Sequence, residues 1–269
     1  MIAPLVVTIT IWLIVFILYV PRDLSYDCFL LTLPESAERQ KTFFRHFSKH
    51  VPITVVHGHD TKKVENARKF EKYVDPKYLE KAIEMSYDPT VIRPNITYFN
   101  LGAIGCMFGH LDVFKRAQQR GSKYALVFED NTIVRANRFY RQVEKVIDKL
   151  GDDFEMVFFH CLSRLPDPKD DAGDKLERVK WISSTKCYLV HVPNMTNYIN
   201  LFLPMNNHVD QKVEDLIKAG ARVYYRDMRG YLKINRTVNS TIGHNQHHRP
   251  DFYSKNYPDA TRKSLKYGY

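Results

Sequence analysis

The chain has 269 residues and a formal net charge of +10, from 40 Lys and Arg against 30 Asp and Glu. No Pro/Ser/Gly-rich linker divides it, which argues against a multi-domain protein and favours one sizeable domain. No aromatic-basic repeat or zinc-finger spacing accompanies the positive charge. We therefore expect no nucleic-acid partner and favour an anionic membrane face or an anionic substrate.

Residues 2–20 (IAPLVVTITIWLIVFILYV) contain no charged side chain. As a helix this stretch would be about 28 Å long, close to the thickness of a hydrocarbon core. It lacks a basic start and a clear small-x-small cleavage site before Pro21. We therefore favour an uncleaved signal anchor over residues 1–22, rather than a cleaved signal peptide, followed by one domain over residues 23–269.

Apolar runs and amphipathic stretches alternate through the first part of that domain. Residues 28–33 (CFLLTL) and 53–56 (ITVV) predict buried strands. An amphipathic helix is expected between them, with Ser36 as its cap. Residues 62–86 are rich in helix-favouring charged residues and are interrupted by Pro76, which predicts two helical pieces.

The second part continues the same alternation. Apolar residues spaced by three and four predict helices, and continuous apolar runs predict strands. In chain order we expect helix 101–120, strand 124–128, helix 137–150, strand 154–162, strand 187–192, helix 194–203, helix 208–219 and strand 221–225. Strands that alternate with helices favour an α/β sandwich with a mostly parallel central sheet.

The apolar strand at residues 124–128 ends abruptly in Glu129, Asp130 and Asn131. A strand within a buried sheet can leave polar groups only at its tip, because desolvating a carboxylate costs several kcal/mol. Ligands of open α/β sheets collect at this edge. Adjacent carboxylates there suit a hard divalent cation that offsets the charge of a diphosphate, although a solvated turn has the same composition.

Four sequence elements stand in a characteristic order. Within residues 101–134, a glycine and a Cys-x-x-x-His open a helix, and an acidic pair ends the strand that follows. In chain order the four elements are the opening strand with Arg39; Gly105, Cys106 and His110 with Glu129-Asp130; Ser184-Thr-Lys-Cys-Tyr188; and Val209-Asp210. Together they resemble glycosyltransferase family 25, the lipooligosaccharide and procollagen galactosyltransferase family.

The resemblance implies a GT-A-like (Rossmann-like) nucleotide-sugar transferase domain over residues 23–269. It implies inverting transfer of a hexose, often galactose or glucose, from a UDP-sugar to a glycan or glycoprotein acceptor, usually assisted by Mn²⁺ (or Mg²⁺). The implied roles are Asp210 as catalytic base, Arg39, His110, Glu129 and Asp130 at the donor, and Asp130, Asn131 and His244 at the metal.

Other roles remain open for three of these residues. Asp210 suits a helix cap or first turn, where it complements the helix dipole. Arg39 suits the solvated face of a helix, and His110 suits a histidine packed at the start of one.

Two residues depart from the family pattern. Gly109 replaces the serine before the histidine, and Asn131 replaces a third acidic residue, which keeps an oxygen but deletes a negative charge. Three outcomes follow: the acidic pair binds the ion with neutral help from Asn131, a tail histidine such as His244 compensates, or the fold persists in an inactive binding or adhesion protein. Besides an active sugar transferase and an inactive binding protein of the same fold, a further hypothesis is a basic nucleotide- or phosphate-binding enzyme outside the family.

One anchor before one domain suits a type II membrane protein of the endoplasmic reticulum or Golgi, from a host cell or a virus. We prefer this location to a bacterial inner membrane. The orientation stays open, because Arg22 is followed at once by Asp23.

Overall fold

The computed structural model describes residues 24–86, 99–135, 137–171 and 175–235. A central sheet consists of β1 (Asp27–Thr32), β2 (Ile53–His57), β3 (Tyr124–Glu129), β5 (Met156–Phe158), β6 (Arg164–Asp171), β7 (Leu176–Ile182), β8 (Cys187–His191) and β9 (Val223–Arg226). Its spatial order is β2-β1-β3-β8-β5-β9-β7-β6. A small second sheet pairs β4 (Thr132–Val134) with β10 (Leu232–Ile234).

The predicted mostly parallel sheet is confirmed. The strands β1, β2, β3, β5, β6 and β9 run in one direction, and only β7 and β8 of this sheet run in the other. The reversed β8 lies between β3 and β5, and its Cys187 is opposite Phe128. The residues that lead into β8 therefore reach the carboxyl end of β3.

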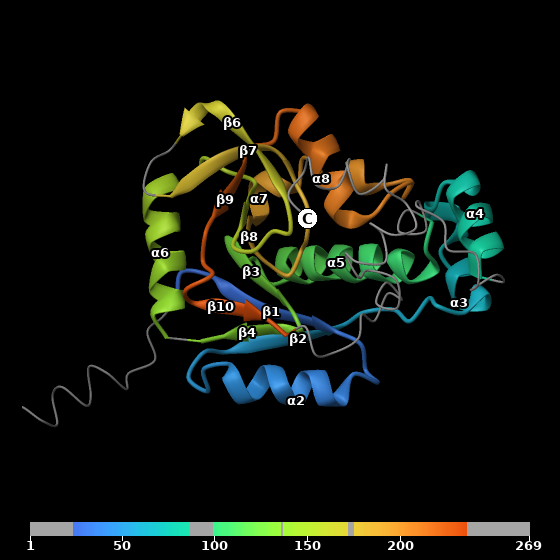
Figure 1. Ribbon diagram of the computed structural model, residues 1–269, viewed down its shortest axis with the longest axis horizontal. Helices are drawn as coiled ribbons and strands as arrows, with labels where there is room; N and C mark the ends of the chain where they lie inside the picture. Colours follow the sequence, from blue (N-terminus) through green and yellow to red (C-terminus); the bar gives the residue numbers. More distant parts are fainter. Residues whose placement is uncertain (1–23, 87–98, 136, 172–174, 236–269) are drawn as a thin grey trace, which may run out of the picture.

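Helices cover both faces of the sheet. They are α2 (Ala37–His46), α3 (Val64–Arg68), α4 (Pro76–Ser86), α5 (Leu101–Gln119), α6 (Arg138–Leu150), α7 (Val192–Met195) and α8 (Val209–Lys218), with 3-10 turns at Glu71–Tyr73 and Ile199–Phe202. Figure 1 shows α2 and α5 on opposite sides of β1. One core joins α2 and α6 to the sheet, and the other joins α5 and α8 to its opposite face.

The double cover explains why the strand sequences lack a polar face. In β1, Cys28 and Leu30 belong to the core beneath α2 and α6, whereas Phe29 and Leu31 belong to the core beneath α5. Successive side chains of a strand point to opposite faces, so a strand covered on both sides must be apolar throughout. The acidic motif after β3 is therefore a genuine boundary of the core.

The structure differs from the predicted elements in four respects. Of the strand expected at 154–162, only Met156–Phe158 forms a β-strand. The helix expected at 194–203 is divided into α7 and the 3-10 turn that follows. Residues 62–86 form three pieces, because a 3-10 turn lies between α3 and α4. The hairpin of β6 and β7 was not predicted, because its charged residues hide the alternation of an edge strand.

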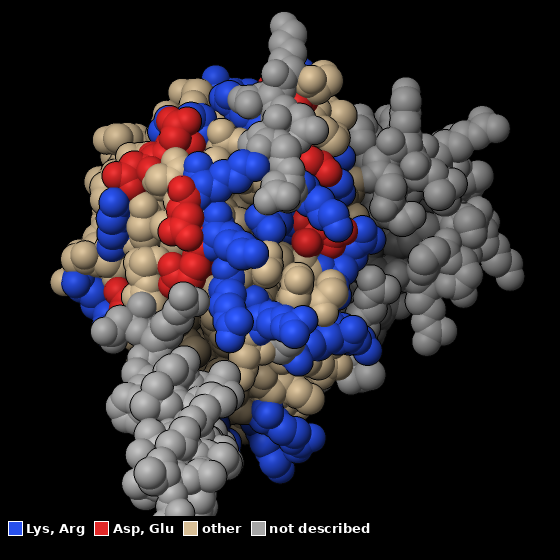
Figure 2. Space-filling model, turned by 90° about the vertical axis from the view of Figure 1, so that its left-hand side faces the viewer, with Lys and Arg blue, Asp and Glu red and all other residues tan. Residues whose placement is uncertain are grey.

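The surface around α6 carries charges of both signs. Lys and Arg gather there beside a row of Asp and Glu (Figure 2). Four basic residues of α6 are exposed at spacings of three and four: Arg138, Arg141, Lys145 and Lys149. The opposite side of α6 packs into the core through Phe139 and Val143, so the helix is amphipathic as predicted.

No helix within the described ranges is both long enough and apolar enough to cross a membrane. The predicted anchor, residues 1–22, lies outside those ranges.

Candidate functional site

The acidic motif lies at the carboxyl edge of two neighbouring parallel strands. Leu31 of β1 is opposite Glu129, the last residue of β3, and Asp130 follows directly. This is the edge at which ligands of α/β sheets bind, as the sequence predicts.

Asp130 is buried and is held by two partners from the start of the domain. Its Oδ2 accepts a hydrogen bond of 2.6 Å from Thr32 Oγ1, and its Oδ1 accepts one of 2.7 Å from Arg39 Nε. A second guanidinium nitrogen of Arg39 contacts the same Oδ1. Arg39 reaches Asp130 because α2 begins immediately after β1. The donor contacts of Arg39 and Asp130 stay predictions, since here the two side chains bind each other.

Glu129 is ion-paired to Lys186, the residue before β8. Lys186 Nζ lies 2.5 Å from Glu129 Oε2, and Thr185 Oγ1 donates to Oε1 at 2.7 Å. Burial alone would raise the pKa of the Glu129 carboxyl, but Lys186 and His110 outweigh it and hold this pKa well below its usual range. Burial also opposes the charge on Lys186, yet Glu129 outweighs it and raises the pKa of the ammonium group. Both groups are therefore charged.

His110 lies behind Glu129 and is fully buried. Its Nδ1 is 2.7 Å from the Tyr188 hydroxyl, and its Nε2 is 3.7 Å from Glu129 Oε1. Burial raises the pKa of the Tyr188 phenol well above its usual value, so Tyr188 is a neutral hydroxyl. The predicted donor contact of His110 is untested; the buried ring faces the site only through Glu129.

Asp210 lies across the short segment of residues 184–186 from Glu129. Its Oδ2 accepts a hydrogen bond of 2.9 Å from the Ser184 backbone N–H, and its Oδ1 accepts one of 3.0 Å from Gln211 N. The next two residues of the segment bind Glu129. Three successive residues therefore join the acidic motif to Asp210, which is in the first turn of α8.

Ser184 adopts a backbone φ of +88°. Residues other than glycine rarely occupy this left-handed region, and such strain concentrates at functional sites. The segment turns here and presents the Ser184 N–H to Asp210.

Cys106 lies among the same groups. Burial raises the pKa of its thiol, the charges of Glu129 and Asp210 raise it further, and Lys186 opposes them. All three charged groups are thus within electrostatic reach of one sulfur on α5. The structure brings together Glu129, Asp210 and the Cys106 helix, which the sequence predicts to share a site.

Two glycines allow α5 to pack closely on the loop after β2. A Cβ at Gly105 would collide with the carbonyl oxygen of His59. A Cβ at Gly109, the position where the family has serine, would lie 2.9 Å from Leu31 Cδ1. With glycine in place of the family's serine, α5 has no side chain at position 109 and packs tightly against the end of β1.

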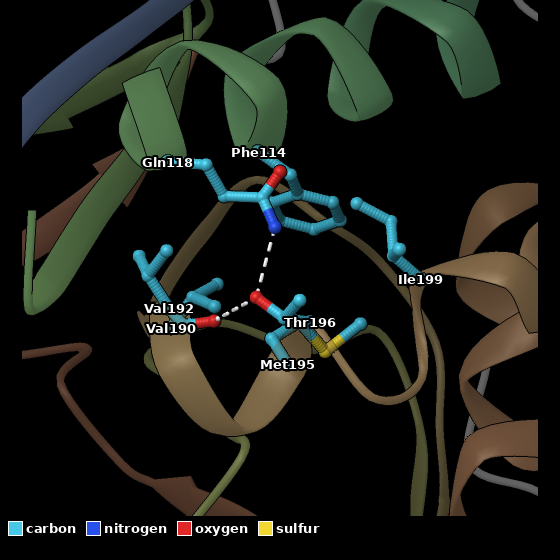
Figure 3. A pocket seen from close by; sticks show the side chains of 7 residues that line it. All are labelled: Phe114, Gln118, Val190, Val192, Met195, Thr196 and Ile199. Atoms are coloured by element: carbon cyan, nitrogen blue, oxygen red, sulfur yellow. Dashed lines mark hydrogen bonds between the residues drawn. The ribbon is translucent and has the colours of Figure 1, made fainter. Parts of the chain in front are cut away.

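A small hollow between α5 and α7 is unsuited to a nucleotide. Its volume is about 10 Å³, room for one water at most. Gln118 and Thr196 are hydrogen-bonded across it at 2.8 Å (Figure 3). Val190 in its wall pairs with Ala125 near the start of β3, so the hollow lies away from the end of β3 that carries the acidic motif.

Residues 26–210 match the family model described as Glycosyltransferase family 25 (LPS biosynthesis protein). The chain belongs to glycosyltransferase family 25. This match spans the acidic motif and Asp210, and it identifies the protein as a glycosyltransferase. No curated protein matches the chain.

Solved structures similar to this family 25 chain are remote. A UTP-bound UGPase from Acinetobacter baumannii is 9% identical, with a TM-score of 0.43 over 78% of this chain and 88% of that one. A UDP-glucose pyrophosphorylase complexed with UDP-glucose is 10% identical, with a TM-score of 0.36 over 75% and 90% of the two chains. At such low TM-scores these likenesses carry no argument about this chain.

The described residues do not fit a Mn²⁺ (or Mg²⁺) ion at the acidic motif. No three His, Cys, Asp or Glu side chains among them gather as a metal site. Each carboxylate of Glu129 and Asp130 is already ion-paired. Asn131 Oδ1 is buried and finds no hydrogen-bond donor in the described part of the chain, but one neutral oxygen is a weak donor set for a divalent ion. His244 lies outside the described residues, so its metal role stays a prediction.

Sequence reasoning missed the groups that neutralise the motif. Lys186 is a single cation at the entrance to the apolar strand CYLVH, and a charge at such a boundary is a detectable signal. Thr32 gave no such signal, because a threonine at a strand end is ordinary.

The Glu129–Lys186 pair predicts a pH dependence of stability. Because the folded-state pKa of Glu129 is depressed, its contribution is fully present above the unfolded pKa of about 4.3 and is lost as the pH falls below it. Urea unfolding of the wild type and Glu129→Gln, compared between about pH 7 and pH 2, should give curves that converge on acidification. Parallel curves would contradict the ion pair.

Proposed function

We propose that the protein transfers a hexose, galactose or glucose, from a UDP-sugar to a hydroxyl of a glycan or glycoprotein, with inversion. The observation that carries this proposal is the 184–186 segment, which joins Asp210 to the acidic motif at the carboxyl edge of β3 in a family 25 chain. An acceptor base and a donor site must lie side by side for direct displacement.

In this reaction Asp210 is the general base. It takes the proton of the acceptor hydroxyl, the hydroxyl oxygen forms a bond to the anomeric carbon, and the bond from that carbon to UDP breaks. Backbone N–H groups of Ser184 and Gln211 fix the carboxylate. A carboxylate has about four lone-pair sites, so Asp210 retains acceptor capacity for the hydroxyl.

The proposal includes the N-terminal anchor. Residues 1–22 would hold the enzyme in the membrane of the endoplasmic reticulum or Golgi, with the bacterial inner membrane as the alternative. Support for the anchor comes from the uncharged stretch of residues 2–20 alone.

A screen of UDP-sugars tests the proposed function. The full chain in detergent should release UDP from one UDP-hexose faster than from the other UDP-sugars, and an added acceptor should accelerate the release. Parallel reactions with Mn²⁺ and with EDTA separate metal-assisted from metal-free turnover. No UDP release from any donor would favour a binding protein on the transferase fold.

A further inference from the structure

Two cations of this chain neutralise the acidic motif. Arg39 pairs with Asp130, and Lys186 pairs with Glu129. The charge of Arg39 acts to lower the pKa of the Lys186 ammonium group, and Asp130 directly follows Glu129 in the chain, so the two pairs are close neighbours. The four side chains sum to zero charge, which leaves little to attract a divalent ion.

Lys186 is the more accessible of the two cations. Its side chain is 28% exposed, against 11% for Arg39. An ammonium group has three N–H donors. Glu129 is the one hydrogen-bond acceptor that the described residues give to Lys186 Nζ. The remaining donors are available to a ligand at the edge of the sheet.

The position of Lys186 suits a phosphate. It directly precedes β8 and lies two residues after Ser184, whose N–H binds Asp210. In the proposed reaction the Lys186 ammonium would lie beside the diphosphate of the departing UDP, and Asp210 would lie on the side of the acceptor hydroxyl. A preorganised cation that meets developing negative charge is an effective source of transition-state stabilisation.

We infer that Lys186 is a phosphate-binding residue, which supplies to the diphosphate of the donor the positive charge that a metal ion at this motif would otherwise supply. The inference rests on the proposed function for its ligand. It makes Glu129 a competitor of the diphosphate for Lys186, a role opposite to that of a metal ligand.

The two roles predict changes of opposite sign at Glu129. If Glu129 competes for Lys186, then Glu129→Gln removes a repelling charge and frees the ammonium, and UDP binds about fivefold more tightly. If Glu129 holds a metal ion, the same change weakens UDP binding. Lys186→Met should weaken UDP binding by about tenfold or more. Lys186→Arg, which keeps the positive charge, should retain most of the wild-type affinity.

Calorimetric titration of the full chain in EDTA tests the inference, with UDP and with inorganic pyrophosphate as probes. We expect binding by the wild type, tighter binding by Glu129→Gln and weaker binding by Lys186→Met. The control is Lys145→Met, which removes an exposed lysine of α6 and should leave the affinity unchanged. The double variant Glu129→Gln/Lys186→Met leaves no unpaired charge and guards against misfolding of the single variant; it too should bind weakly.

The two probes separate this inference from the proposed function. Binding of pyrophosphate that depends on Lys186, with no preference for UDP, would support Lys186 as a phosphate site and count against a UDP-sugar donor. UDP binding that requires Mn²⁺ and ignores Lys186→Met would overturn the inference and leave the function standing. The inference would also be overturned if neither UDP nor pyrophosphate bound in EDTA.

Discussion

Replacing Asp130 with Asn should lower the free energy of unfolding by about 3 to 5 kcal/mol. The asparagine keeps the shape and can still accept from Thr32, but it removes the negative charge that Asp130 presents to the largely buried Arg39 guanidinium. Breaking a buried pair costs far more than the pair itself contributes, because the remaining ion stays desolvated. Urea unfolding with a fluorescence or circular-dichroism signal measures the change.

A double-mutant cycle isolates the pair. Arg39→Met should cost a similar amount, whereas Arg39→Met/Asp130→Leu should recover most of the loss, because no buried charge remains. Glu38→Gln on the same helix is the matched control; its ion pair with Lys41 is exposed and 3.9 Å long, so the change should stay within about 0.5 kcal/mol. A loss below about 1 kcal/mol for Asp130→Asn would show that the pair is not buried in solution.

Replacing Asp210 with Asn should lower the turnover rate by about 10² to 10⁴-fold. The amide oxygen can still accept from the Ser184 N–H, so the fold is retained, but the side chain can no longer take a proton. Donor turnover with acceptor, measured as UDP release, gives kcat, and urea unfolding of the same variant confirms that its stability changes by less than about 1 kcal/mol.

The control for Asp210 lies about one turn further along the same helix. Glu214→Gln removes a carboxylate of α8 that pairs with Lys218 at the surface, and it should leave kcat unchanged. Equal rates for the wild type and Asp210→Asn would assign the base to another residue.

The fold was predictable where one physical signal dominates. The strand β3 and the helices α5, α6 and α8 follow directly from apolar runs and from apolar spacing of three and four. The β6–β7 hairpin was not predictable in the same way, because β6 is the edge strand of the sheet and exposes residues such as Leu165. The reversal of β8 also depends on long-range pairing with β3, which no local pattern encodes.

The site was predictable as a place but not as a set of partners. A carboxylate cannot enter a buried sheet unpaired, so Glu129 and Asp130 had to mark its edge. Which cation pairs with each carboxylate depends on how α2 and β8 meet that edge, so neither the Arg39–Asp130 pairing nor the Lys186–Glu129 pairing followed from local sequence. The structure places Asp210 near the motif; its expected catalytic role came from resemblance to the family rather than from periodicity, and it stays a prediction.

A crystal structure of the full chain with UDP tests the central claim most directly. We predict that the diphosphate lies at the carboxyl edge of β1 and β3, within hydrogen-bond distance of Lys186 Nζ, with the Asp210 carboxylate facing the place of the sugar. UDP bound at the opposite edge of the sheet, or remote from both Lys186 and Asp210, would contradict the account.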